Sequence, residues 1–429
     1  MIISVLSSII VWGIIAVIAL RVINFSGISI SSGRSYKFLT ADLCISHQSE
    51  TAYKALNIFL NAFLFRLIVF ILEILILYMF TDQEYTFSTF LRRLEIWDCT
   101  NYFRISTVGY SGYNENGIYS TLVFFPLYPY IAKILNFIIH NTHISLLLTS
   151  FLTYSGGCVF LYKLCLIDYG HNAAKKAVIY ASIFPFAFFF GAMMNESMLF
   201  FTSAMTLYFI RKHKWPLVGI CGALAALSRM VGIVLAIPAA IEWLEHYKIL
   251  EKLKSKNIKE VWKLFYSKGL WIFLMLLGLG IYLFCNYSVA GNWFQFLDYQ
   301  NNIWGNGSCY FGNHISTVAS YAVNISDRTR MFSTWLPYLL LIVFCLIMMV
   351  YGLRRDRSMY LAYFISYFIL NASIQYPISG CRYMSCIIPL FIVLADFTER
   401  HEKADRWITV IFSVLFGIYL VAYLHDMVI

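Results

Sequence analysis

The chain has 429 residues, of which 60% are hydrophobic, 18% are aromatic and only 13% are charged. About a quarter of the residues in soluble domains are charged, so this composition excludes an ordinary water-soluble protein and indicates a membrane protein. The net charge of +10 does not indicate a nucleic-acid partner, because the lysines cluster in short loops between apolar runs, as in the cytoplasmic loops of multispanning proteins.

Long apolar runs recur along the chain, and a helix needs about 20 such residues to cross the hydrocarbon core. The first run lacks the positive start and the small-residue cleavage site of a signal peptide, so we expect a retained helix. In chain order the predicted spans are residues 2–23, 55–80, 118–140, 144–167, 176–191, 194–210, 269–290, 334–353, 358–378, 384–397 and 407–427. The fold class expected is an all-α integral membrane protein, a multispanning helical bundle with about 11 to 13 transmembrane segments.

The apolar stretch 216–244 is long for one straight span and short for two, and Ser228 and Arg229 interrupt its middle. Basic residues flank it on both sides, "RKHK" at 211–214 and then seven lysines: Lys248, Lys252, Lys254, Lys256, Lys259, Lys263 and Lys268. If both flanks are cytoplasmic, the stretch is a hairpin of two short helices with Arg229 near its far tip. An arginine at that depth must face protein or a polar cavity, or else snorkel to the surface.

The same rule places the basic segments 354–357 and 399–406 inside, and the loops 81–118, 291–333 and 377–383 outside or in a lumen. The basic "HNAAKK" at 171–176 then leaves an odd number of crossings for two apolar runs. The prolines at 126 and 129 make 118–140 the segment that we expect to lie partly along the interface.

The exterior loop 81–118 holds the first candidate for chemistry, Asp98. Trp97 and Tyr102 can stack on a sugar or anchor at the interface, and Arg104 can meet a phosphate. A carboxylate in that setting can accept a proton from an attacking hydroxyl, although an aromatic belt with an incidental helix cap is an equal alternative.

Three further stretches contain polar residues beside apolar runs. "FFPLYPY" at 124–130 breaks regular helix and predicts a cavity wall rather than a lipid-facing helix. Glu196 lies between two apolar runs as a second acid or, more in keeping with its place, a structural acceptor. The run 291–307 is rich in Trp, Phe, Gln and Asn, which suits a carbohydrate.

Arg382 begins a helix from the exterior side and can, with Arg229, bind the phosphate of a lipid-linked donor through paired hydrogen bonds. An interfacial snorkelling arginine is the structural alternative.

These motifs, in this order, resemble the GPI mannosyltransferase II (PIG-V) family and its bacterial relatives. The resemblance covers about residues 55–397 and rests on six motifs: Trp-Asp-x-x-x-Tyr-x-x-Ile-x-x-x-Gly-Tyr at 97–110, Phe-Phe-Pro-Leu-Tyr-Pro at 124–129, Asn-Glu-Ser-x-Leu-Phe at 195–200, Ser-Arg-x-x-Gly at 228–232, Phe-x-x-x-Gln-x-x-x-Trp-Gly at 296–305 and Arg-Tyr-x-x-x-x-x-Pro-Leu-Phe at 382–391. Cys99 stands where the family usually has a small residue. The domains expected are an extra helix and polar linker at 1–54, the transferase domain at 55–397, and a loop and helix at 398–429.

The resemblance implies a GT-C glycosyltransferase with its active site at the outer or lumenal face. It would transfer mannose, with inversion, from a polyprenyl or dolichyl phosphate donor to a lipid or glycolipid acceptor. Carried over by position, Asp98 would be the general base. The residues that would bind substrate are Trp97, Tyr102, Arg104, Glu196, Arg229, Gln300, Trp304, Arg382 and Tyr383. Neither a metal nor another cofactor is expected.

Two rival functions remain open at this stage. A transporter or flippase of lipid-linked glycans should pair ionisable residues near mid-membrane and show internal symmetry, and a non-catalytic subunit of a transferase complex should be inactive alone. The compact loops favour a bacterial plasma membrane, with the endoplasmic reticulum membrane as the eukaryotic equivalent.

Overall fold

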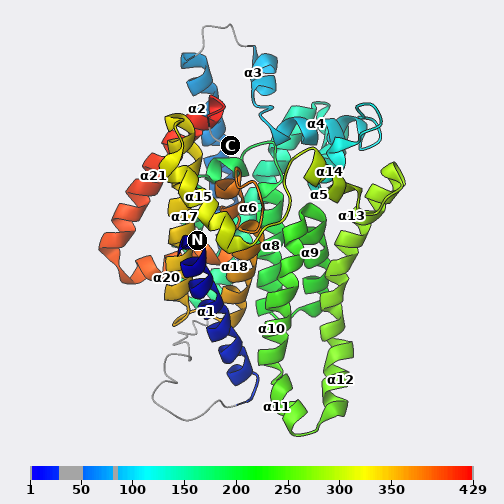
Figure 1. The fold of residues 1–429 in the computed structure, drawn as a ribbon, viewed down its shortest axis with the longest axis vertical. Helices are drawn as coiled ribbons and strands as arrows, with labels where there is room; N and C mark the ends of the chain where they lie inside the picture. The colour runs from blue at the N-terminus through cyan, green and yellow to red at the C-terminus, as the bar shows by residue number, and fades with distance from the viewer. Residues whose placement is uncertain (1, 29–51, 81–85, 428–429) are drawn as a thin grey trace.

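The computed structural model describes residues 2–28, 52–80 and 86–427, and these residues are almost entirely helical (Figure 1). The described residues contain no β-strand, only isolated bridges between Glu115 and Ile118 and between Ser308 and Ile374. The expected all-α fold is confirmed. The linker at 29–51 lies outside the described residues.

Six helices of the described residues are long and apolar enough to cross a membrane. They comprise α1 (Ile2–Phe25), α2 (Ala52–Met79), α6 (Thr142–Asp168), η5 with α13 (Gly269–Leu274, Met275–Ala290), α16 with η6 and α17 (Arg328–Arg330, Met331–Trp335, Leu336–Gly352), and α21 (Glu402–Leu424). The protein is therefore a multi-pass membrane protein.

Shorter helices lie between the long ones along the chain. They are α7 (His171–Ile183) and η3 (Ala187–Phe190), α8 (Glu196–Arg211), α9 (Trp215–Ser228), η4 (Met230–Leu235), α10 (Ala236–His246), α18 (Ser358–Asn371), α19 (Gly380–Met384) and α20 (Ile388–Arg400). The expected 11 to 13 transmembrane segments require these helices to cross as well, and that number stays a prediction.

The stretch 216–244 is the predicted hairpin. Arg211 at the end of α8 pairs with Asp168 at 2.7 Å and with Glu242 of α10 at 2.9 Å, so both flanks of the hairpin lie at one end of the bundle. Arg229 caps α9 at the opposite end, where an extended residue separates α9 from η4. We call the end with Arg211 and the lysine loop the inner end, and the end with Arg229 the outer end.

The predicted span at 118–140 is not a single helix, and its place along the interface stays a prediction. The segment forms η2 (Ser120–Val123) and α5 (Leu127–Ile139), whose 13 residues cover about 20 Å, less than the thickness of the hydrocarbon core. The start of α6, directly after α5, lies at the outer end, since His143 contacts Glu95 and Phe103 there. This placement removes the odd crossing.

Three other segments differ from the expected ones. The helix predicted over 358–378 ends at Asn371. The helix predicted over 176–191 ends at Ile183, because Phe184 is held extended before Pro185. The exterior loop 291–333 contains two helices, α14 (Gln295–Asn302) and α15 (Phe311–Asn324), and α15 packs on α1 and α17. The outer end also carries α3 (Phe87–Arg93) and α4 (Asp98–Val108), and the inner end carries α11 (Ile249–Lys254) and α12 (Ile258–Ser267) (Figure 1).

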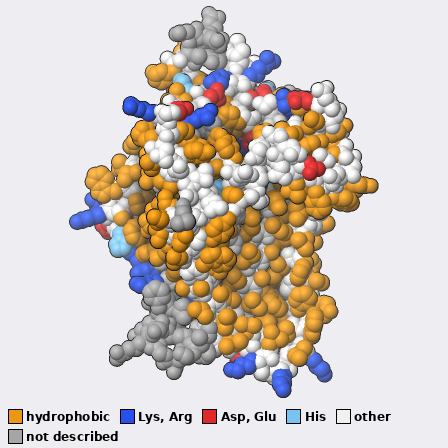
Figure 2. Space-filling view, viewed as in Figure 1, with side chains coloured by type: hydrophobic (Ala, Val, Ile, Leu, Met, Phe, Trp, Pro, Cys, Tyr) orange, Lys and Arg blue, Asp and Glu red, His pale blue; other side chains and the backbone are white. Residues whose placement is uncertain are grey.

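The surface has an apolar middle and charged ends, as expected of a bundle that spans a membrane. Figure 2 shows hydrophobic side chains over the middle of the molecule, with Lys and Arg at its lower, inner end and both basic and acidic side chains at its upper, outer end. The chain finishes at the outer end, where Asp426 pairs with Arg93 at 3.0 Å.

Candidate active site

A cavity of about 980 Å³ lies at the outer end of the bundle. Its walls come from the start of α4, the segment before α5, the tip of the α9–η4 hairpin, α14, and the loop that joins α18 to α19. Segments distant in the sequence therefore meet around one space.

Asp98 is the first residue of α4, and the backbone before it has an unusual conformation. Trp97 has φ of 51°, a left-handed value that non-glycine residues rarely adopt, and strain of this kind clusters at functional sites. The Trp97 ring packs edge-on against Tyr423 with centroids 6.0 Å apart. The strained turn thus begins a helix with Asp98 on the cavity wall.

Asp98 belongs to a cluster of two carboxylates and two guanidinium groups. Arg382 Nη2 donates to Asp98 Oδ2 at 2.6 Å, and Arg382 Nε lies 3.1 Å from Glu196 Oε1. Arg229 Nη1 donates to the same Glu196 oxygen at 3.2 Å. Glu196 therefore holds the two arginines side by side.

The four groups differ in depth. The side chains of Arg382 and Glu196 are 5% and 3% exposed, whereas those of Asp98 and Arg229 are each 21% exposed. Burial opposes the charge of Arg382, but Asp98 and Glu196 outweigh it and hold the pKa of Arg382 well above its ordinary value. An incoming ligand would first meet the two more exposed groups, the carboxylate of Asp98 and the guanidinium of Arg229.

Aromatic rings pack against the charged cluster of Asp98, Glu196 and the two arginines. The guanidinium of Arg229 lies 3.9 Å from the ring centre of Tyr383, whose hydroxyl accepts from Arg382 Nη2 at 3.3 Å. Tyr102 lies one helical turn after Asp98 and packs edge-on against Phe124 and Tyr128, each 5.3 Å away.

The wall predicted from "FFPLYPY" is confirmed. Phe124 and Phe125 line the cavity. The carbonyl oxygen of Leu122, four residues before Pro126, accepts from Tyr282 at 2.7 Å, and that of Phe124 accepts from Tyr110 at 2.6 Å, so backbone groups beside the prolines bond to protein. Phe125 also stacks on Tyr282 of α13 at 3.8 Å.

The structure brings most of the predicted site residues together. Those on the cavity wall are Trp97, Asp98, Tyr102, Arg229, Gln300, Trp304, Arg382 and Tyr383. Glu196 lies behind the arginines and contacts the cavity only through them.

Arg104 is placed wrongly by the sequence prediction. It lies outside the cavity, with its guanidinium 3.9 Å from the ring centre of Tyr113. Residues 98 and 102 are four apart and share one face of α4, whereas residue 104 points to another face.

Sequence reasoning missed several polar residues that line the cavity: Asn101, Asn195, Asn301, Asn306, His314 and Asn371. Asn195 Nδ2 donates to the carbonyl oxygen of Ser228 and so joins α8 to the hairpin tip that carries Arg229. Asn195, Asn301 and Asn306 lie in runs that the sequence singled out but were not selected there, whereas His314 and Asn371 belong to no motif. Among the described residues, no group of three or more His, Cys, Asp and Glu side chains is arranged to hold a metal ion.

Comparison with known proteins gives a partial family match. Residues 125–284 match the model of the family described as dolichyl-phosphate-mannose-protein mannosyltransferase. This range includes Glu196 and Arg229 but neither Asp98 nor Arg382. No curated protein matches the chain.

Among solved structures, the chain is similar to the archaeal oligosaccharyltransferase AglB from Archaeoglobus fulgidus, in complex with an inhibitory peptide and a dolichol-phosphate. The TM-score is 0.40, the sequence identity is 11%, and the match covers 87% of this chain and 55% of that one. The chain thus spans about half the length of that structure.

Proposed function

We propose that this protein is a GT-C membrane glycosyltransferase that moves one sugar from a polyprenyl or dolichyl phosphate donor to a hydroxyl group of a lipid or glycolipid acceptor. The observation that carries the proposal is the cluster in the outer cavity, where Asp98 lies beside the paired guanidinium groups of Arg382 and Arg229. The family match over residues 125–284 supports it, since the family's name includes a dolichyl-phosphate-linked mannose.

The two arginines suit a phosphodiester. Guanidinium groups bind phosphate oxygens through paired, charge-assisted hydrogen bonds. Glu196 holds Arg229 and Arg382 close enough to act on one phosphate. Because they are positioned before the donor arrives, they can stabilise the charge that develops on the leaving group.

The bonds, the proton and the charge of the proposed reaction balance at the cluster that contains Asp98 and the two arginines. The acceptor oxygen attacks the anomeric carbon, the bond from that carbon to the phosphate oxygen breaks, and Asp98 takes the acceptor proton. The donor phosphodiester carries one negative charge and the phosphate product carries two, while Asp98 becomes neutral. The total charge beside the arginines therefore stays constant.

The remaining cavity wall suits sugars. Gln300, Trp304 and Trp97 offer amide groups and aromatic faces without further charge. Such walls bind hydroxyl groups and the apolar faces of sugar rings. We propose that they hold the acceptor.

Mannose is the sugar that we propose. Six motifs resemble the GPI mannosyltransferase II family, and the matched family model also names mannose transfer. The matched model names a protein acceptor, whereas the motif family acts on a glycolipid, and we favour the lipid or glycolipid acceptor. A bacterial plasma membrane remains our proposed location.

The experiment uses purified protein with radiolabelled polyprenyl phosphate mannose and a membrane lipid fraction. We expect label in lipid with the unaltered chain and at least a hundredfold less with Asp98→Asn, because a general base contributes about 10² to 10⁴ in rate. Glu95→Gln is the matched control, since Glu95 lies in the same outer region but pairs with His143 away from the cavity.

Full activity of Asp98→Asn would contradict the assigned base. Radiolabel found in protein rather than in lipid would contradict the proposed lipid or glycolipid acceptor. If the folded protein transfers no mannose to any acceptor, a transporter or a non-catalytic subunit would be favoured instead.

A further inference from the structure

The inner end carries a strongly basic element that the proposed reaction does not use. Residues 247–268, which we call the basic hairpin, comprise α11, α12 and the turn between them. Between 248 and 268 there are seven lysines but only two acidic residues, Glu251 and Glu260.

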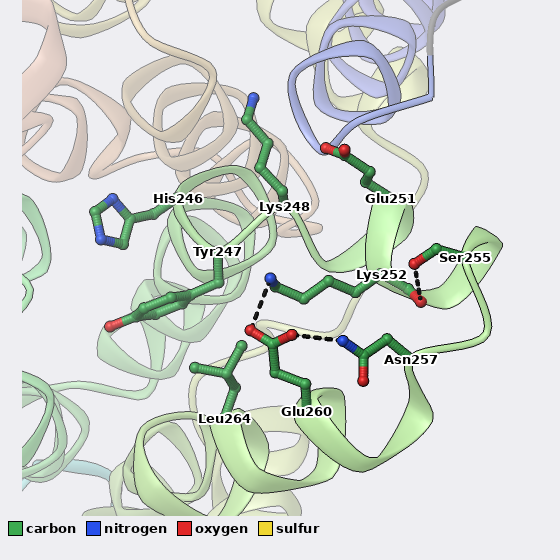
Figure 3. A pocket seen from close by; sticks show the side chains of 9 residues that line it. All are labelled: His246, Tyr247, Lys248, Glu251, Lys252, Ser255, Asn257, Glu260 and Leu264. Carbon is green, nitrogen blue, oxygen red and sulfur yellow. Dashed lines mark hydrogen bonds and ion pairs between the residues drawn. The ribbon is translucent and has the colours of Figure 1, made fainter.

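A pocket of about 460 Å³ lies inside the basic hairpin (Figure 3). Its charges are already balanced. Lys252 Nζ pairs with Glu260 Oε1 at 2.8 Å, Asn257 Nδ2 donates to Glu260 Oε2 at 2.7 Å, and Lys248 Nζ donates to the carbonyl oxygen of Phe25. These contacts hold the hairpin together, and the pocket itself offers no excess positive charge.

The excess charge lies on the outside of the hairpin. Five lysines there are exposed and have no ion-pair partner within the described part of the chain: Lys254, Lys256, Lys259, Lys263 and Lys268. Five unpaired cations on a surface of about 20 residues attract an anionic partner.

One face of α12 is apolar and exposed. Ile258, Trp262 and Tyr266 recur every four residues, and they are 54%, 52% and 63% exposed. Helical spacing of this kind puts the three side chains on one face, and Lys259 and Lys263 lie along one edge of it.

This apolar face continues into the lipid-facing surface of the next span. Leu270 and Phe273 of η5, at the start of the span Gly269–Ala290, are also exposed. Figure 2 shows hydrophobic side chains reaching down to the lysines at the inner end. Tryptophan and tyrosine at the end of a span are typical of the membrane interface.

We propose that the basic hairpin binds the anionic headgroups of phospholipids in the inner leaflet. Trp262 and Tyr266 lie at the boundary of the acyl chains, and the five unpaired lysines contact the headgroup phosphates. A basic amphipathic helix with aromatic residues on its apolar face binds an anionic membrane surface in two ways. Its apolar face is buried at the acyl chains, and its basic residues are attracted to the headgroups.

The test measures which phospholipids remain bound to the full chain after extraction from bilayers of phosphatidylcholine and phosphatidylglycerol in equal parts. We expect phosphatidylglycerol to be enriched on the unaltered protein. Replacing the five unpaired lysines with glutamine should lower the enrichment at least about tenfold, since each lysine near an anionic surface contributes. Replacing the same five with arginine keeps the charge and should keep the enrichment.

Equal enrichment in the glutamine variant would overturn the proposal, as would loss of enrichment in the arginine variant. If the glutamine variant fails to fold, the salt dependence of the unaltered protein decides: enrichment that persists in about 1 M salt, where charges are screened within about 3 Å, overturns it. Displacement of the lipid by excess glycerol 3-phosphate would indicate a site for a free anion and would also overturn it.

Discussion

At the scale of single residues, the charged cluster contains one carboxylate on the cavity wall and one behind it. Asp98 and Glu196 both contact Arg382, but only Asp98 lies on the cavity wall. The sequence identified both acids and both arginines, and it favoured Glu196 as a structural acceptor. It could not predict that both acids contact Arg382, because the two helix ends that carry the acids are about 100 residues apart in the chain.

Glu196→Gln should destabilise the protein and weaken donor binding. The substitution keeps the shape of the side chain but leaves the buried Arg382 and the partly buried Arg229 without their shared counter-ion. Breaking a buried pair costs about 3 to 5 kcal/mol of unfolding free energy, whereas the half-buried Glu95 and His143 pair should cost about 1 kcal/mol or less. Thermal unfolding of Glu196→Gln beside Glu95→Gln checks this, and equal losses would show that Glu196 is not the central counter-ion.

At the scale of elements, the position of Arg229 depends on how closely α9, η4 and α13 approach one another. The hairpin at 216–244 was predictable because basic flanks mark both of its ends as cytoplasmic. The helices α14 and α15 were not, because a polar exterior run gives no strong apolar period. The early end of α7 was foreseeable from Pro185, which disfavours helix in the preceding residue.

Gly278→Ala should separate α13 from α9. A Cβ atom at Gly278 would lie 1.9 Å from the backbone oxygen of Ala223, which cannot move without shifting α9. Overpacking of this kind costs about 1 to 3 kcal/mol in unfolding free energy. Gly280→Ala on the same helix is the control, because its Cβ atom would have no neighbour within 4 Å. Thermal unfolding of both variants measures the difference, and equal stability would contradict the close contact.

At the scale of the whole molecule, ion pairs have different roles at the two ends of the bundle. The outer end places a cluster of ion pairs on the cavity, whereas ion pairs at the inner end join helices: Asp168 of α6 binds both Arg211 of α8 and Arg357 before α18. The composition predicted a membrane protein, and the positions of the basic loops predicted which end of the bundle is cytoplasmic. The inner network was not predicted, because its members are single charged residues at the ends of separate helices.

Asp356, in the loop between α17 and α18, should make stability depend on pH. Burial raises the pKa of Asp356 to about 7 from its ordinary 3.8. The folded state then keeps a proton that the unfolded state releases, so the free energy of unfolding falls as pH rises from about 4 to about 7 and is level above that. The change is at most about 4 kcal/mol, at about 1.4 kcal/mol per pKa unit.

Asp356→Asn is uncharged at every pH and should flatten this part of the profile. Thermal unfolding of the unaltered protein and of Asp356→Asn between about pH 4 and pH 8 compares the two. The same slope in both proteins would show that another group is responsible.

The most direct measurement of the central claim is donor binding and sugar transfer in the same Asp98→Asn protein, with Arg229→Gln beside it. We predict that Asp98→Asn loses transfer by at least about a hundredfold but binds polyprenyl phosphate as well as the unaltered chain or more tightly, because Arg382 is released from its ion pair. Arg229→Gln should lose donor affinity. If Asp98→Asn instead loses donor binding in parallel with transfer, or keeps transfer, Asp98 is not the base and the account of the site is wrong.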